Sequence, residues 1–408
     1  MPLDIDFVRS HFPPFTNPAL KDQAFFESAG GSYACNHVID RLTRFYRERK
    51  VQPYWPFDAS RLGGEEMDEA RRRLSAMLGV DEDELSFGPS TTQNTYVLAQ
   101  AFAETLAPGD AIIVTNQDHE ANSGPWRRLE KRGFEIREWS VEPDTGHLPL
   151  EGLDALLDDK VKLVAFPHCS NVVGEINPVK EIADRVHAAG AVFCVDGVSY
   201  APHGFPDVKS LGADIYLFSA YKTYGPHQGI MVVRRALGER LANQGHYFNA
   251  DSLTKKFTPA GPDHAQIAAC AGMADYVDAL YAHHLGDDGA PPLKRAGAVH
   301  DLMRGHEKKL LQPVLDYLAA KNTVRLLGPA SAEKRAPTIA LALQENGEQV
   351  AKRLAAKGVN CGGGAFYADR LLNALDVDQA LGGLRISFVH YTSKAEVEKL
   401  LRALDEHL

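Results

Sequence analysis

Short apolar runs alternate with helical patterns between about residues 65 and 235. The runs span residues 111–115 (AIIVT), 161–166 (VKLVAF), 191–196 (AVFCVD), 214–219 (DIYLFS) and 230–235 (IMVVRR). Segments with helical periodicity lie around and between them, at residues 67–78, 92–106, 125–133 and 178–190. Runs that are apolar at consecutive positions are typical of strands buried on both faces, and intervening helices are typical of parallel connections. The pattern predicts an α/β domain with a mostly parallel sheet.

The pattern changes after about residue 250. A long helical stretch at residues 264–284 is followed by separate strand-like runs at 324–328, 338–343 and 384–389, and an amphipathic helix closes the chain at 394–408. Separated strands and helices of this kind indicate a smaller α+β domain. We therefore expect an N-terminal arm (1–20), a large α/β domain (21–262) and a small C-terminal domain (263–408).

Composition narrows the class of protein. The 408 residues are 44% hydrophobic with a formal net charge of -10, which disfavours nucleic acid as a partner. No apolar run approaches the roughly 20 residues that span a bilayer, and the first residues carry acids rather than the basic head of a signal peptide. We expect a cytoplasmic protein that does not bind membranes. Five widely spaced cysteines without a CxxC pair predict neither a disulfide framework nor a metal site.

Polar residues follow the predicted strands where each strand ends. They are His119, Asn171, Asp196, Ser219 and Lys222. The carboxyl ends of parallel strands meet at one edge of a sheet, where ligands bind. Residues 88–92 (GPSTT) form a turn before a helix, whose free N–H groups and hydroxyls suit an anion. We expect these groups to converge on one crevice.

Each of these residues also has a structural explanation. Thr91 or Thr92 could cap a helix, Asp196 could belong to a turn, His119 could be structural, and Lys222 could be solvated. Together, however, they supply an amine for a Schiff base, a carboxylate for a pyridinium nitrogen, an imidazole to stack on a ring and a turn for a phosphate. That combination is what pyridoxal 5'-phosphate requires.

This chemistry explains a lysine after an apolar strand. Asp196 would keep the cofactor's ring nitrogen protonated, so that the ring accepts electrons from the substrate α-carbon. Lys222 would hold the aldehyde, release it to the substrate amine and then carry a proton. Burial or nearby positive charge that lowers the lysine pKa would support both roles.

Several motifs in order along the chain carry a family resemblance. They are FFESAGGSYACNHVID (25–40), GPSTTQN (88–94), NQDHEANSGPW (116–126), HCSNVVGEINPVKEI (168–182), VDGVSYAPH (195–203), FSAYKTYGP (218–226) and LRISFVHYTSKAEVEKL (384–400). The chain resembles the class V aminotransferase family, in its cysteine desulfurase-like branch. The resemblance implies a fold type I pyridoxal phosphate enzyme, commonly a homodimer with active sites near the subunit interface.

The resemblance also implies residue roles. Lys222, Asp196 and His119 are the implied catalytic residues. The implied cofactor-binding residues are Thr91, Thr92, Asn171, Asp196, Ser199, Ser219, Tyr221 and Lys222. The implied substrate-binding residues are Arg385, Asn171, Ala29 and Gly30. Arg385 would clamp the substrate α-carboxylate with its two-pronged guanidinium; the alternative is a surface arginine on an edge strand.

Departures from the family pattern bear on the reaction. Tyr367 stands where family desulfurases carry a loop cysteine that attacks the substrate sulfur, and Cys361 lies six residues earlier. Tyr221 replaces the histidine that usually precedes the lysine, and Ser199 replaces a glutamine. The cofactor site stays recognisable, but a persulfide mechanism is not expected.

These observations favour a lyase that eliminates the sulfur of cysteine or a related small amino acid. Class V transamination is the main alternative, and epimerase-like and kynureninase-like chemistry stay open. Ser219 to Lys222 also satisfies S-x-x-K, the motif of serine acyl enzymes, but the chain has neither S-D-N nor K-T-G. No G-x-G-x-x-G follows a strand, which disfavours a nicotinamide site.

Overall fold

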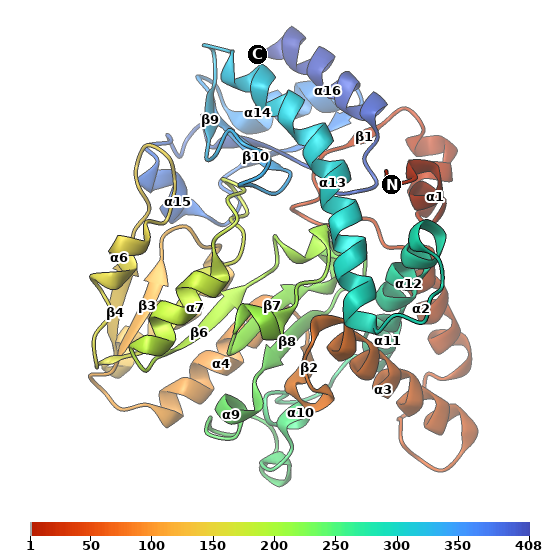
Figure 1. Cartoon of the computed structure of the whole chain (residues 1–408), viewed down its shortest axis with the longest axis vertical. Helices are drawn as coiled ribbons and strands as arrows, with labels where there is room; N and C mark the ends of the chain where they lie inside the picture. Colours follow the sequence, from red (N-terminus) through yellow and green to blue (C-terminus); the bar gives the residue numbers. More distant parts are fainter. Residues whose placement is uncertain (1) are drawn as a thin grey trace.

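The structure is a computed structural model that describes residues 2–408, and a seven-stranded sheet is its centre (Figure 1). The strand order is β2-β8-β7-β6-β5-β3-β4. The strands are β2 Leu85–Gly88, β3 Ala111–Thr115, β4 Glu135–Trp139, β5 Val161–Pro167, β6 Val192–Asp196, β7 Ile215–Ser219 and β8 Gly229–Val233. Strand β8 is antiparallel to both of its neighbours, β2 and β7, and the other strand pairs of this sheet are parallel. The predicted mostly parallel sheet is therefore confirmed.

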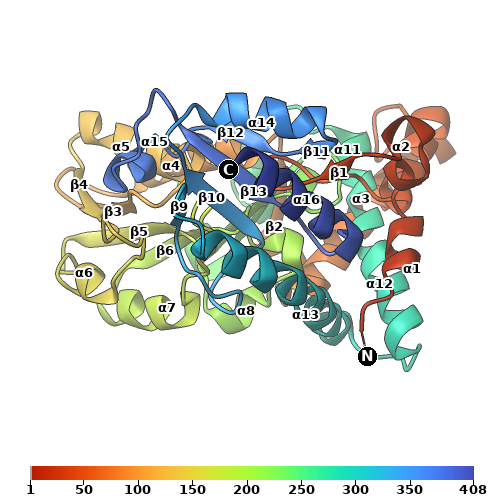
Figure 2. The same ribbon diagram turned by 90° about the horizontal axis from the view of Figure 1, so that it is seen from above.

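Helices cover both faces of the sheet, as Figure 2 shows from above. On one face lie α4 Thr91–Thr105 and α5 Glu120–Arg127, and on the other lie α6 Leu150–Asp154, α7 Val179–Ala188 and α8 Val208–Leu211. Alternate strand residues serve the two faces: Leu163 belongs to the core under α4 and α5, and Val164 to the core under α7. The continuous apolar runs in the sequence follow from this double burial.

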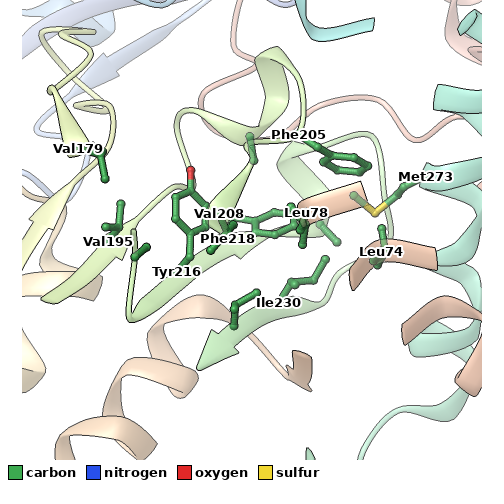
Figure 3. Packing of buried hydrophobic residues seen from close by; sticks show 14 of the residues in the cluster. Leu74, Leu78, Val179, Val195, Phe205, Val208, Tyr216, Phe218, Ile230 and Met273 are labelled. Carbon is green, nitrogen blue, oxygen red and sulfur yellow. The ribbon is translucent and has the colours of Figure 1, made fainter. Parts of the chain in front are cut away.

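One core joins the sheet to helices at its far edge (Figure 3). Phe218 of β7 and Ile230 of β8 pack with Leu74 and Leu78 of α3 Asp58–Leu78 and with Met273 of α12 Ala271–Leu285. These side chains are almost fully buried, so each removes most of its apolar surface from water. Burial of this kind contributes roughly 1.5 to 3 kcal/mol per large apolar side chain.

The C-terminal part carries a four-stranded antiparallel sheet in the order β12-β13-β10-β9. Its strands are β12 Gly362–Gly364, β13 Gly383–Ser387, β10 Thr338–Ala342 and β9 Arg325–Leu327. The long helix α13 Pro292–Ala319 contacts α3 and α12 at one end and α16 Lys394–His407 at the other (Figure 1). Strand β1 Ala24–Phe25 pairs with β11 Val359–Asn360, which ties the start of the chain to this part. The domain boundaries at 20 and 262 stay a prediction.

The remaining α-helices complete the list of elements. They are α1 Ile5–Ser10, α2 Asn36–Glu48, α9 Arg235–Gly238, α10 Leu253–Lys256, α11 His264–Ala269, α14 Gly347–Ala356 and α15 Asp369–Ala374. None of the helices described for residues 2–408 combines the length and apolarity needed to cross a membrane.

Several sequence-based elements differ from the structure. The predicted helix at 264–284 is two helices, α11 and α12, which meet at Cys270. Close packing against α2 accompanies this break, because a Cβ on Gly272 would lie 2.6 Å from the backbone carbon of His37. The predicted helix at 125–133 begins five residues earlier, at Glu120, and ends as a 3-10 turn.

Candidate functional site

A pocket lies at the carboxyl ends of β3, β5, β6 and β7. Its lining residues are Ser90, Thr91, Thr92, Asp118, His119, Ala121, Pro167, Cys169, Asn171, Asp196, Val198, Ser199, Ser219, Tyr221 and Lys222. Of the predicted site residues, only Arg385, Ala29 and Gly30 are outside this lining.

Lys222 ends a short 3-10 helix, Ala220–Lys222, that begins where β7 ends. Its side chain is buried, and a Cβ on the following Gly225 would lie 2.6 Å from the sulfur of Met273, so this turn packs closely against α12. Burial and then the positive charge of Arg385 lower the Lys222 pKa to about 8, although Asp196 and Glu27 oppose the change. A neutral amine is therefore accessible near neutral pH.

Asp196 is the last residue of β6, and it is buried in the same pocket. Burial raises its pKa to about 6, while the backbone N–H of Val198 and the charge of Lys222 oppose the shift. That N–H donates to Asp196 Oδ1 over 2.8 Å. The amine and the carboxyl group are both shifted toward their neutral forms.

His119 caps the N-terminus of α5. Its Nδ1 accepts a hydrogen bond from the backbone N–H of Ala121 at 3.0 Å, so the neutral ring carries its proton on Nε2. Burial, with the positive charges of Lys222 and Arg385, lowers its pKa to about 3. The ring therefore stays uncharged at neutral pH.

Hydroxyl groups gather at the N-terminus of α4. Thr91 Oγ1 lies 2.8 Å from Ser219 Oγ, and both side chains are buried. The possibility that Thr91 or Thr92 caps α4 is wrong, because Ser90 is the cap and its hydroxyl accepts from the N–H of Gln93. The two threonines are therefore the first residues of the helix, beside N–H groups that have no partner within it.

Arg385 lies next to the pocket in strand β13, which pairs with β12 and β10. The alternative of a surface arginine on an edge strand is wrong, because the side chain is buried between two neighbouring strands. Its Nη1 donates to the backbone oxygen of Asn171 at 3.2 Å, and its Nη2 lies 2.5 Å from Glu27 Oε1. The Asn171 side chain in turn donates to the backbone oxygen of Phe366 at 2.9 Å.

The other predicted residues surround this centre. Ala29 lines a narrower cavity that shares Ser199 and Lys222 with the main pocket. Gly30 lies beside the Glu27 carboxylate. Tyr221 lines the main pocket, and its ring stacks on His227 with centroids 4.9 Å apart.

Asp118 is a pocket residue that the sequence did not single out. It is buried, and it accepts hydrogen bonds of 3.2 Å from Thr115 and Asn122. Burial, followed by the charge of Asp196, raises its pKa well above the usual range. Its place directly before His119 in the motif NQDHEAN was the available signal.

The thiols near the pocket are not ionised near neutral pH. Burial and then the charge of Glu27 raise the Cys361 pKa to about 12, and burial raises that of Cys169, a lining residue, to about 12. Tyr367 is exposed, with its ring centroid 5.4 Å from that of His119. Across residues 2–408 no group of three or more His, Cys, Asp and Glu side chains is arranged to hold a metal ion.

Comparisons with known proteins agree with this geometry. The chain is 34% identical to the aminotransferase-like protein FGM3 of Gibberella zeae over 98% of both chains. It is 30% identical to a cysteine desulfurase of Serratia proteamaculans over 99% of this chain and 98% of the relative. The apo cysteine desulfurase of Thermococcus onnurineus shares the fold, with a TM-score of 0.83, 23% identity and coverage of 100% of this chain and 98% of that one. The model of the family described as Aminotransferase class-V matches residues 24–284 and 296–400. The chain therefore belongs to the class V aminotransferase family, and it is a cysteine desulfurase-like, pyridoxal phosphate-dependent enzyme, a transferase or a lyase.

Proposed function

We propose that this enzyme is a lyase that cleaves the Cβ–S bond of cysteine or a related small amino acid by β-elimination. The observation that carries the proposal is one pocket with a buried, readily deprotonated amine at Lys222, a buried carboxyl group at Asp196 and no ionised thiol beside them. Elimination of this kind needs a base at the α-carbon and needs no cysteine nucleophile.

The residues of the pocket fit pyridoxal phosphate. Lys222 would hold the aldehyde, Asp196 the ring nitrogen, and His119 would lie over the ring. Thr91, Thr92 and Ser219 would hold the phosphate at the N-terminus of α4, where hydroxyls and free N–H groups meet. When bound, the cofactor supplies an electron sink for the carbanion at the substrate α-carbon.

The chain's own groups then move and hold protons. Lys222 Nζ, with a pKa of about 8, accepts the α-proton near neutral pH and can pass it to the sulfur that leaves from the β-carbon. His119 stays neutral and offers its Nε2–H as a donor, because its Nδ1 is occupied by Ala121. Overall, cysteine and water yield sulfide, pyruvate and ammonia.

The state of the thiols supports elimination over persulfide formation. A nucleophilic cysteine must be a thiolate, and burial raises the pKa of Cys361 to about 12. Tyr367, which takes the place of the loop cysteine, has no sulfur to accept the transferred atom. Sulfur would therefore leave as sulfide.

Transamination is the second candidate, and the 34% identity to a protein named aminotransferase-like favours it. It needs protonation at the cofactor carbon and a keto acid as second substrate. Lys222 is a suitable proton carrier for that route as well.

Purified, cofactor-loaded enzyme distinguishes the two. Sulfide and pyruvate released together from cysteine, without added keto acid, support elimination. Conversion of bound cofactor to its amine form, with turnover that requires a keto acid, contradicts elimination and supports transamination. Release of alanine together with enzyme-bound persulfide would contradict both candidates.

We also propose the homodimer expected for this family. Tyr54, Trp55 and Phe57 are exposed aromatic side chains in one segment between α2 and α3, and such patches commonly mark protein interfaces. Light scattering on the purified enzyme should give twice the chain mass of 44.7 kDa.

A further inference from the structure

The Arg385 guanidinium already has a carboxylate partner inside the protein. Glu27 Oε1 lies 2.5 Å from Arg385 Nη2, and the two side chains are 30% and 5% exposed. Nη1 donates to the backbone oxygen of Asn171, and Nε has no hydrogen-bond partner. Nη2, one of the guanidinium nitrogens that would bind a substrate carboxylate, is therefore already paired with Glu27.

Two glycines make room for this carboxylate. A Cβ on Gly30 would lie 2.7 Å from Glu27 Oε1, and a Cβ on Gly362 would lie 2.9 Å from Oε2, so any other residue at these positions would crowd it. Oε2 is buried and has no hydrogen-bond partner. The carboxylate is thus accommodated beside Arg385, but only one of its oxygens is bonded there.

The two partners differ in how firmly they are held. Arg385 is fixed by strands on both sides, by the Asn171 carbonyl and by the Phe366 ring, whose centroid lies 4.3 Å from the guanidinium carbon. Glu27 is partly exposed and its carboxylate lies at the end of a flexible side chain. An exchange of partners would therefore move Glu27 and leave Arg385 in place.

We propose that Glu27 is the resting counter-ion of Arg385 and that the substrate's α-carboxylate displaces it, which makes Glu27 a specificity-determining residue. This proposal rests on the proposed function, in which Arg385 binds that carboxylate. A buried guanidinium left unpaired is strongly unfavourable, so Arg385 keeps one carboxylate or the other. An ester or amide substrate offers no negative charge to replace Glu27, and it is rejected.

Binding of propionate to the cofactor-loaded enzyme tests the exchange without turnover. Propionate carries a carboxylate but no amine, and propionamide is its uncharged control. Isothermal titration calorimetry compares wild type, Glu27→Gln and the double variant E27Q/R385Q, which removes both charges and leaves neither one unpaired. We expect E27Q to bind propionate about tenfold more tightly than wild type, because the competing carboxylate is gone. We expect no gain for propionamide, and loss of propionate binding in the double variant.

Equal or weaker propionate binding by E27Q would overturn the proposal, because Glu27 would then only orient Arg385. Retained binding in E27Q/R385Q would overturn it too, and would remove Arg385 from the proposed carboxylate site. Glu27→Asp is a second variant. It keeps the negative charge but shortens the side chain by one methylene, which moves the carboxylate away from Arg385. We expect its affinity for propionate to lie between those of wild type and E27Q. The cysteine elimination assay reports on the reaction alone, so its failure is distinct from a failure of propionate binding.

Discussion

Two clusters of charged side chains in this enzyme behave in opposite ways. On α2, α3 and α12, Arg41 lies 2.8 Å from Glu69 and 2.5 Å from Asp275, and Arg73 lies 2.8 Å from Asp278. Burial alone would raise the pKa of Asp275, but hydrogen bonds from Arg41 and Arg73 outweigh it and lower that pKa. In this outer cluster the ionised forms are stabilised.

In the pocket the shifts run the other way. Burial lowers the pKa of Lys222 to about 8 and raises that of Asp196 to about 6. No hydrogen bond joins these two side chains. The cost of burying their charged forms is therefore not offset as it is in the outer ion pairs. The outer cluster therefore stabilises the fold, whereas the pocket holds the pKa values of Lys222 and Asp196 near neutral pH, where both groups exchange protons readily.

The largest expected effect comes from Lys222→Ala. Turnover should fall by about 10³-fold or more, since the variant loses the cofactor's covalent anchor and the proton carrier. A steady-state assay with cofactor quantification checks this. The matched control is Lys256→Ala, which removes another buried lysine. Lys256 donates a hydrogen bond to the backbone oxygen of Gly238, and its loss should leave kcat within about twofold of wild type. If Lys222→Ala kept a tenth of wild-type turnover, Lys222 would not be the cofactor's anchor and proton carrier.

Asp196→Asn should lower turnover by about 100-fold, because the neutral amide no longer holds a proton on the ring nitrogen. The same substitution should stabilise the apoprotein at high pH, although it lowers turnover. The folded pKa of Asp196 is raised from 3.8 to about 6, so the native state binds the extra proton between those values. Its contribution to the unfolding free energy therefore falls as pH rises through that window, and Asn removes the fall. Urea denaturation at pH 4 and pH 8 should show a gain for Asp196→Asn at pH 8 relative to pH 4.

Asp275→Asn should lower the unfolding free energy by about 1 to 3 kcal/mol at pH 7 and leave kcat nearly unchanged. Because the folded pKa of Asp275 is lowered, its stabilisation is present above pH 3.8 and is lost as pH falls through the folded pKa. Urea denaturation at pH 8 and pH 4 should therefore show similar losses for Asp275→Asn, and the loss should shrink when the series is extended below pH 3.8. A loss of activity without a loss of stability would contradict the division between the two clusters.

The smallest effect concerns the pH dependence of cofactor capture. Only the neutral lysine attacks an aldehyde, so capture by apoprotein should rise with pH, with a midpoint near 8. The negative charge of Glu27 raises the Lys222 pKa, so Glu27→Gln should move that midpoint to lower pH. Stopped-flow absorbance across pH 6 to 10 measures it, and a midpoint above that of wild type would contradict the assignment.

The sheet was predictable because its strands are buried on both faces. Strand β3 has the same bounds as the predicted run AIIVT. Strands β5 and β7 agree with the predicted runs VKLVAF and DIYLFS to within one residue at each end. Strand β4, with the sequence EIREW, was missed because it lies at the edge of the sheet and its exposed positions are charged. Strand β2 was missed because LSFG is too short to show a period.

The candidate site was predictable where it depends on strand ends. His119, Asn171, Asp196 and Lys222 line one pocket because the strands or turns that carry them end at the same edge. The partner of Arg385 was not predictable, because Glu27 is 358 residues away along the chain and meets it only through tertiary packing. The raised pKa of Asp118 likewise depends on burial next to Asp196.

The most direct measurement is borohydride reduction of the cofactor-loaded enzyme, followed by peptide mass spectrometry. Reduction fixes the cofactor on the amine that holds it. We predict one modified peptide, with the added mass on Lys222, and no modification of a Lys222→Ala control. A modified lysine elsewhere, or cofactor that is bound but never fixed to a side chain, would contradict the central claim.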